Sequence, residues 1–177
     1  MCRYAMIAYK PHYACFSCQK TFKRRLLKDV DRDAETSTEA RCPECGELMA
    51  SMGKDFKSPP KNDDKKWQHI RSLYTVGITF HSCGCSGPGY IPNDKETTIS
   101  YLKQIRSGYE ESLVFWRNRT EPESKEERIK DYQRNWHQLS VVKSNAEKQG
   151  VSNHEGIDYW IKRIHEVEER IKLAEKM

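Results

Sequence analysis

The sequence predicts an α+β protein, in which a small N-terminal region of short antiparallel strands precedes a mainly α-helical half. Three observations support this prediction. Two Cys-x-x-Cys pairs lie within the first 45 residues, beside short segments with the alternating pattern of half-buried strands. From residue 93 onward, apolar residues recur at steps of three and four, as in amphipathic helices. The last two helical segments follow capping-box sequences, which predicts an antiparallel helical hairpin over about residues 121–177.

The two cysteine pairs, Cys15 with Cys18 and Cys42 with Cys45, have 23 residues between them. A Cys-x-x-Cys pair in a tight turn points both thiolates at one ion, and two such turns supply the four tetrahedral sulfurs that structural zinc prefers. We therefore expect all four cysteines to bind Zn²⁺. Iron is the alternative metal, because four thiolates do not decide between the two metals. Two structural disulfides are the alternative without a metal.

Length and composition limit the class of protein. A chain of 177 residues forms one large or two small domains, and 36% hydrophobic against 32% charged residues indicates small cores with much solvated surface. The first ten residues contain no long apolar run, so we expect a cytoplasmic protein without a signal peptide or membrane span. No P-loop, dinucleotide fingerprint or nucleophile–base pattern is visible, which disfavours an ordinary enzyme.

The net charge of +5 is unevenly distributed between two predicted domains, residues 1–92 and residues 93–177. The first holds 15 Lys/Arg and 10 Asp/Glu, whereas the second holds 16 of each. All of the positive excess therefore lies in the half that carries the cysteine pairs. A Zn(Cys)₄ centre carries a charge of about −2, which would lower this excess without removing it.

Short elements are expected around the cysteine pairs. Residues 9–14 and 20–26 are predicted strands on either side of the first pair, and residues 78–80 a third short strand. Asn62 or Asp63 can cap a helix that runs to about residue 74. This helix is expected to pack on the strands, because the cysteine region alone has few apolar residues. The apolar face of the helix comprises Trp67, Ile70 and Tyr74.

A glycine-rich segment follows at residues 81–92 and contains His81, Cys83 and Cys85. One hypothesis is a second metal or thiol site on this loop. The alternative is a tight turn with two unreactive thiols, because a Cys-x-Cys with one neighbouring histidine is not a complete ligand set. The residues that could complete such a set are His12, His69 and Cys2.

The second half is predicted to be helical. Asp94 can cap a helix over residues 95–107 that ends at Gly108, and residues 109–117 form the next helical segment. Capping boxes at residues 120–123 and 152–155 then begin the two helices of the hairpin. The predicted seam of the hairpin comprises Ile129, Tyr132, Trp136, Leu139 and Val142 on the first helix and Ile157, Trp160, Ile164, Val167, Ile171 and Ala174 on the second.

The two cysteine turns, with Lys and Arg following the first, resemble the rubredoxin-like knuckles of the zinc-ribbon fold group over about residues 9–57. That group includes ribosomal, transcription and replication proteins and many bacterial proteins of unknown role. The resemblance implies a zinc ribbon with the four cysteines as ligands. A likeness of fold does not identify a function, so the functional hypotheses depend on individual residues.

The favoured functional hypothesis is a binding module for nucleic acid, because a basic surface beside a rigid ribbon can contact phosphates. The candidate phosphate contacts are Lys20, Lys23, Arg24, Arg25, Arg41, Lys54 and Lys57, and the candidate stacking rings are Phe16, Phe22 and Phe56. These rings could instead fill the small core. Two other hypotheses stay open: an adaptor that docks a protein through the helical hairpin, and a thiol- or metal-handling protein that uses Cys83 and Cys85.

Overall fold

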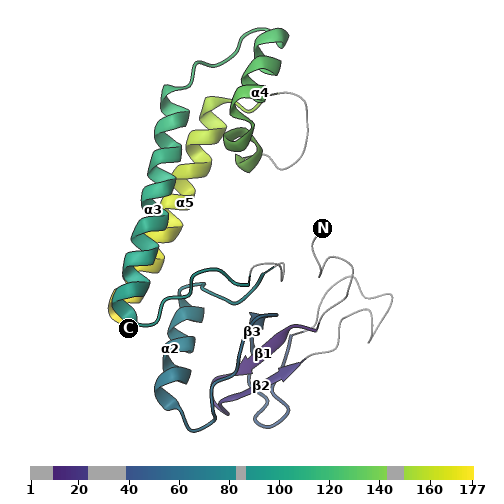
Figure 1. Ribbon diagram of the computed structural model, residues 1–177, viewed down its shortest axis with the longest axis vertical. Coiled ribbons are helices and arrows are strands. Elements are labelled where there is room, and N and C mark those ends of the chain that lie inside the picture. The colour runs from purple at the N-terminus through teal and green to yellow at the C-terminus, as the bar shows by residue number, and fades with distance from the viewer. Residues whose placement is uncertain (1–9, 24–38, 83–86, 143–149) are drawn as a thin grey trace. The chain divides into compact units, whose positions relative to one another are not determined.

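The computed structural model confirms the α+β fold and describes residues 10–23, 39–82, 87–142 and 150–177 (Figure 1). The chain divides into two compact units between Thr98 and Ile99. The described elements are β1 (His12–Cys15), β2 (Lys20–Lys23), β3 (Ala50–Gly53), α2 (Asp64–Thr75), α3 (Lys95–Asn118), α4 (Lys125–Val142) and α5 (Asn153–Lys176).

The first unit contains a three-stranded antiparallel sheet in the order β2-β1-β3. On the central strand, Tyr13 lies opposite Phe22 on one side and Ser51 on the other. The first cysteine pair lies between the two predicted strands, with Cys15 at the end of β1 and Cys18 in the turn that follows. The first strand is shorter than expected, and residues 24–26 of the second predicted strand lie outside the described residues.

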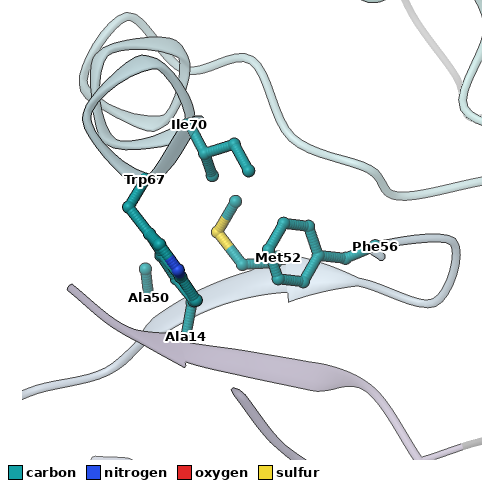
Figure 2. Close-up of a cluster of buried hydrophobic side chains, with 6 residues drawn as sticks. All are labelled: Ala14, Ala50, Met52, Phe56, Trp67 and Ile70. Carbon is teal, nitrogen blue, oxygen red and sulfur yellow. The ribbon is translucent and has the colours of Figure 1, made fainter. Parts of the chain in front are cut away.

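Helix α2 covers one face of this sheet through a small apolar core (Figure 2). Small side chains on the central and edge strands leave room for the indole of Trp67, which is only 2% exposed. The core comprises Ala14, Ala50, Met52, Phe56, Trp67 and Ile70. The prediction that α2 packs on the strands through Trp67 and Ile70 is therefore confirmed. Tyr74 is 38% exposed instead, and its neighbour Leu73 is buried.

The ends of α2 follow the capping pattern of the sequence. The side chain of Asp63 accepts a hydrogen bond from the Lys66 N–H at 3.2 Å. At the other end Gly77 has a φ of +73°, which glycine adopts without steric cost. The N–H of Ile78 then donates to Leu73 O at 2.8 Å, so the last turn of the helix is closed by a backbone bond.

Residues 78–80 do not form a separate strand, but the backbone pairs with the chain around β3. The Phe80 N–H donates to Met52 O at 2.9 Å, and the Asp55 N–H donates to Phe80 O at 3.2 Å. Gly53 permits this approach, since a Cβ built on it would lie 2.6 Å from Phe80 backbone atoms. These bonds attach the segment after α2 to the edge of the sheet.

In the second unit, α3 is one continuous helix, so the predicted break at Gly108 is wrong. A glycine inside a helix costs about 1 kcal/mol relative to alanine, and tertiary packing on either side outweighs so small a penalty. Asp94 caps the helix as predicted, because its carboxylate accepts from the Thr97 N–H at 2.8 Å.

The C-terminal part of α3 runs antiparallel to the N-terminal part of α5 (Figure 1). Trp116 lies directly over Gly156, and the rings of Tyr109 and Trp160 are 5.2 Å apart. The buried residues of this core are Leu113, Trp116, Leu139, Val151 and Trp160. Of the predicted face of α5, four residues are buried and two are half-buried. The buried ones are Trp160, Val167, Ile171 and Ala174, and the half-buried ones are Ile157 and Ile164.

The predicted seam of α4 is wrong for three residues. Ile129, Tyr132 and Trp136 are 52%, 56% and 49% exposed, whereas Leu139 is buried. The reason is that α4 turns another face inward, where Asp131 meets Arg119. Asn135, with φ −117° and ψ 19°, also interrupts the regular helix.

Of the two predicted capping boxes, one is confirmed and the other lies at a different position. The box at Ser152 and Glu155 is confirmed, since the Glu155 N–H donates to Ser152 Oγ and the Ser152 N–H donates to Glu155 Oε2. For α4 the box lies one turn later than predicted. There the Glu127 N–H donates to Ser124 Oγ at 3.1 Å, and the Glu127 carboxylate accepts from the Glu123 N–H at 3.0 Å.

Candidate metal centre

Each cysteine pair is positioned by a short hairpin of the first unit. Cys15 ends β1, and Cys18 lies in the turn that leads into β2. The second pair occupies the tip formed by residues 42–47, where the Cys42 N–H donates to Glu47 O at 2.8 Å. The bridge between Arg41 and Leu48 closes the base of this tip. Two local hairpins therefore present their cysteines to a common point.

The four sulfurs have the spacing of one tetrahedral ion. All four Sγ atoms lie within 4.8 Å of one another. The sulfurs of Cys15 and Cys45 are 3.5 Å apart, and those of Cys42 and Cys18 are 3.9 Å apart. A metal–sulfur bond of about 2.3 Å places tetrahedral sulfurs about 3.8 Å apart, between these two values. All four thiols are free, so the disulfide alternative does not describe this cluster.

The residue after each cysteine pair adopts the left-handed backbone conformation. Gly46 has a φ of +75°, and Gln19, in the matching position of the first turn, has a φ of +51°. This conformation costs a non-glycine residue roughly 1–2 kcal/mol. The Gln19 side chain is held there by donation from Nε2 to Asp64 Oδ1 at 2.7 Å, which ties the first turn to α2.

Without a bound cation, two of the four thiols resist ionisation. Burial raises the pKa of the Cys15 thiol, and a hydrogen bond with Cys45 is the main cause that raises the pKa of Cys18 to about 12. Burial also acts to raise the pKa of Cys42, but the N–H groups of Cys45 and Glu44 outweigh it and lower the pKa to about 7. Four adjacent thiols cannot all ionise without a counter-charge, which a bound dication supplies.

Polar contacts join the two cysteine turns to each other. Ser17 in the first turn donates to the carboxylate of Glu47 beyond the second, and Lys20 forms an ion pair with Glu44. Sequence reasoning missed both contacts, because partners 30 and 24 residues apart leave no local pattern. They connect the two turns through side chains other than the cysteines.

Two of the four cysteines of the metal centre are buried in the protein, whereas the other two are in contact with solvent. Cys15 and Cys42 are buried, Cys18 is half-buried and Cys45 is exposed. Phe16, which lies between the first two cysteines, packs against α2, with its ring centroid 6.4 Å from that of Trp67 and 5.9 Å from that of Tyr74. The metal turn and the apolar core therefore share a side chain.

The predicted nucleic-acid contacts have different environments. Lys23, Arg41 and Lys57 are exposed, and Lys54 is half-buried. The Arg41 guanidinium pairs with Glu39 at 2.9 Å, and Lys20 pairs with Glu44 as described above. The predicted contacts Arg24 and Arg25 lie outside the described residues.

The candidate stacking rings also differ from one another. Phe56 is only 3% exposed in the core of the first unit, so its predicted stacking role is wrong. Phe16 and Phe22 are half-buried. The exposed ring of Tyr74 beside Phe16 is an additional candidate that the helical pattern of the sequence assigned to the core.

Only part of the second predicted site lies within the described residues. His81 is exposed, whereas Cys83, Cys85 and Cys2 fall outside the described ranges. His12 Nδ1 is 2.8 Å from Phe56 O, and His69 Nε2 is 2.9 Å from Pro92 O, so a backbone carbonyl engages one ring nitrogen of each. Among the residues that the structure describes, the four-cysteine group is the one cluster able to hold a metal ion.

No protein-family model, curated protein or solved structure matches this chain. Among the described helices, none combines the length and the apolar character needed to cross a membrane. The assignment of the metal centre therefore depends on the geometry of its own residues.

Proposed function

We propose that the four-cysteine cluster binds one structural zinc ion, and that the ribbon it fixes is a binding surface for nucleic acid. The observation that carries the first part is the tetrahedral spacing of the sulfurs, 3.5 Å and 3.9 Å across the two turns. Tetrahedral sites with four cysteines are most often structural zinc sites, and iron, which four thiolates also bind, is the alternative that metal analysis decides.

The ion would stabilise a unit whose apolar core is small. Six buried residues form that core, and a domain of this size has little stability to spare. Structural zinc in small domains contributes on the order of 10–16 kcal/mol of apparent binding free energy at neutral pH. Cys15, Cys18, Cys42 and Cys45 would hold the ion and fix the two turns relative to each other.

The charge distribution supports nucleic acid as the partner. The positive excess of the chain lies in residues 1–92, and Lys23, Arg41 and Lys57 expose their side chains. Cations of this kind contact phosphates, and partly exposed aromatic rings stack on bases. Phe16 and Tyr74, with ring centroids 5.9 Å apart, offer such a surface beside the metal centre.

Metal analysis of the purified protein tests the first part. We expect one zinc per chain, and we expect Cys42→Ser to lose it. The matched control is His81→Ala, which removes an exposed histidine outside the cluster. Iron in place of zinc would contradict the identity of the metal. A Cys42→Ser variant with full metal content would contradict the ligand assignment.

Fluorescence anisotropy with a labelled single-stranded oligonucleotide tests the second part. Lys23→Glu combined with Lys57→Glu should weaken binding, and the salt dependence should flatten by roughly 0.7 of a unit for each lost contact. The control is Lys103→Glu, which reverses an exposed charge on α3. Absence of salt-dependent binding would refute the nucleic-acid proposal and leave the zinc assignment untouched.

A further inference from the structure

Helix α4 presents three large apolar side chains to solvent on one face. Ile129, Tyr132 and Trp136 are 52%, 56% and 49% exposed, and they follow the spacing i, i+3 and i+7. Residues at this spacing lie above one another on a helix. We name these three residues the α4 stripe. A contiguous apolar surface of this kind is typical of an interaction site.

The helix is held so that the stripe faces outward. Asp131, on another face of α4, forms an ion pair with the nearly buried Arg119 at 2.6 Å and accepts a hydrogen bond from Asn135 at 2.7 Å. Leu139 is buried in the apolar core of the second unit. Rotation of α4 to bury the stripe would remove Asp131 from Arg119 and leave a buried cation without its counter-charge, which is strongly unfavourable.

The size of the stripe indicates the kind of occupant. An aromatic side chain buries about 150–250 Å² when fully covered, so three half-exposed side chains offer about 300 Å². A stable dimer interface takes about 800 Å² from each partner. Self-association through the stripe alone is therefore insufficient. An area of this size suits a weak, transient contact with a single helix that is laid along α4.

The charges beside the stripe indicate the chemistry of that helix. Lys125 lies four residues before Ile129 and Arg128 lies four residues before Tyr132, so both cations border the stripe, and both are exposed. Glu127 is engaged in capping α4, where it accepts from the Glu123 N–H. Glu126, which is exposed and lies three residues before Ile129, borders the stripe as well. Two cations and one carboxylate leave the N-terminal border of the stripe with a net positive charge, which complements carboxylates on a partner.

A protein partner fits these observations better than nucleic acid. The stripe contains an aliphatic residue, Ile129, which offers no ring for base stacking. Along α4, the carboxylates of Glu126, Glu127 and Asp131 offset most of the cationic charge. A backbone of phosphates needs a continuous cationic track, which this helix lacks.

We propose that the α4 stripe docks an acidic amphipathic helix of a partner protein. The three apolar side chains act as anchors at helical spacing, and Lys125 and Arg128 pair with carboxylates at the edge of the partner helix. This interaction uses the second unit and does not depend on the metal centre or on nucleic acid.

Anisotropy titration of the purified full chain with a defined probe tests the proposal. The probe is a fluorescein-labelled 18-residue peptide, designed as an amphipathic helix with leucine anchors and glutamate flanks. A second peptide carries lysine in place of each glutamate. We expect saturable binding of the acidic peptide, about ten-fold tighter than that of the basic one. The variant Tyr132→Ala/Trp136→Ala should lose about ten-fold or more in affinity.

Two further variants make the test specific. Val114→Ala removes a side chain that is 53% exposed on α3, and it should leave peptide binding unchanged. Lys125→Glu/Arg128→Glu keeps the stripe and should reverse the preference toward the basic peptide. Helical content and melting temperature, measured by circular dichroism, confirm that each variant is folded before its affinity is compared.

Other outcomes overturn the proposal. Absence of saturable binding to the acidic peptide would refute it, as would an equal loss in Val114→Ala. Self-association in sedimentation runs that disappears in Tyr132→Ala/Trp136→Ala would assign the stripe to a second copy of the chain. Oligonucleotide binding that depends on Trp136 would assign the stripe to nucleic acid.

Discussion

The guanidinium of Arg119 lies against the carboxylate of Asp131, with Nη2 2.6 Å and Nε 3.1 Å from Oδ2. Nη1 of the same side chain donates to Val151 O at 2.9 Å and to Asn153 Oδ1 at 2.7 Å. The Arg119 side chain is only 3% exposed. Arg119, the first residue after α3, thus connects α4 with the segment that leads into α5.

Loss of the acidic partner should destabilise the helical unit. Asp131→Ala leaves the Arg119 guanidinium buried without a counter-charge, which costs about 3–5 kcal/mol. Urea unfolding monitored by far-UV circular dichroism measures this loss. A double variant, Arg119→Met/Asp131→Leu, removes both charges and should recover the part of the loss that comes from the unpaired buried cation. It should not recover the contribution of the Arg119 bonds to Val151 O and Asn153 Oδ1, which the methionine cannot make.

The control for this prediction is an exposed pair on α5. Arg163 and Glu166 lie 3.4 Å apart, and both side chains are 47% exposed. Water screens such a pair, so Glu166→Ala should cost less than about 1 kcal/mol. Equal losses in Asp131→Ala and Glu166→Ala would show that Arg119 does not organise the unit.

The same pair predicts how stability depends on pH. Burial acts to raise the pKa of Asp131, but hydrogen bonds from Arg119 and Asn135 outweigh it and hold the pKa below the ordinary 3.8. A carboxylate with a lowered pKa contributes stability that is present above the unfolded-state value and is lost as the pH falls through the folded-state value. Helical stability should therefore decline below about pH 4. In Asp131→Ala this part of the decline should be absent from thermal melts recorded between pH 7 and pH 3.

Local sequence signals predicted where the helices lie better than they predicted which faces of the helices are buried. The capping box at Ser152 and the stepping of apolar residues along α5 depend on residues three or four apart, and both are confirmed. The same stepping on α4 predicted a buried face at Trp136, which is exposed. The orientation of α4 depends on the contact between Arg119 and Asp131. Periodicity along one helix carries no information about such a contact.

At the metal centre, too, the sequence predicted local geometry but not contacts between distant residues. Spacing within each Cys-x-x-Cys pair predicted that its two sulfurs face one ion, because the turn geometry is local. The contact of Gln19 with Asp64 joins residues 45 positions apart. Its formation depends on how α2 packs on the sheet, and the composition of either segment does not indicate it.

Gly156 should not tolerate a side chain, although it lies inside a helix. Replacement of a helical glycine by alanine normally stabilises by about 1 kcal/mol. A Cβ on Gly156, however, would overlap the indole of Trp116, which is fully buried. We expect Gly156→Ala to destabilise the helical unit by about 1–3 kcal/mol, as overpacked cores do. Urea unfolding gives this value directly.

Gly108 supplies the matched control within α3. Nothing lies within 4 Å of a Cβ built at this position, and its backbone is helical. Gly108→Ala should therefore stabilise the protein by about 0.4–1 kcal/mol. Stabilisation by both substitutions would contradict the close packing of Trp116 on Gly156.

Removal of the metal should unfold the first unit and spare the second. The core under α2 is small and shares Phe16 with the first cysteine turn, so loss of the turns removes part of the core. The core of the helical unit contains Leu113, Trp116 and Trp160 and uses no metal ligand. Hydrogen exchange measured by mass spectrometry, before and after chelation, separates the two units. Amides of β1, β3 and α2 should lose protection, whereas those of α3 and α5 should keep it, and added zinc should restore the original pattern. Protection of α2 that survives chelation would show that Trp67 and its neighbours suffice without the ion, and loss of protection in α5 would show that the units fold together.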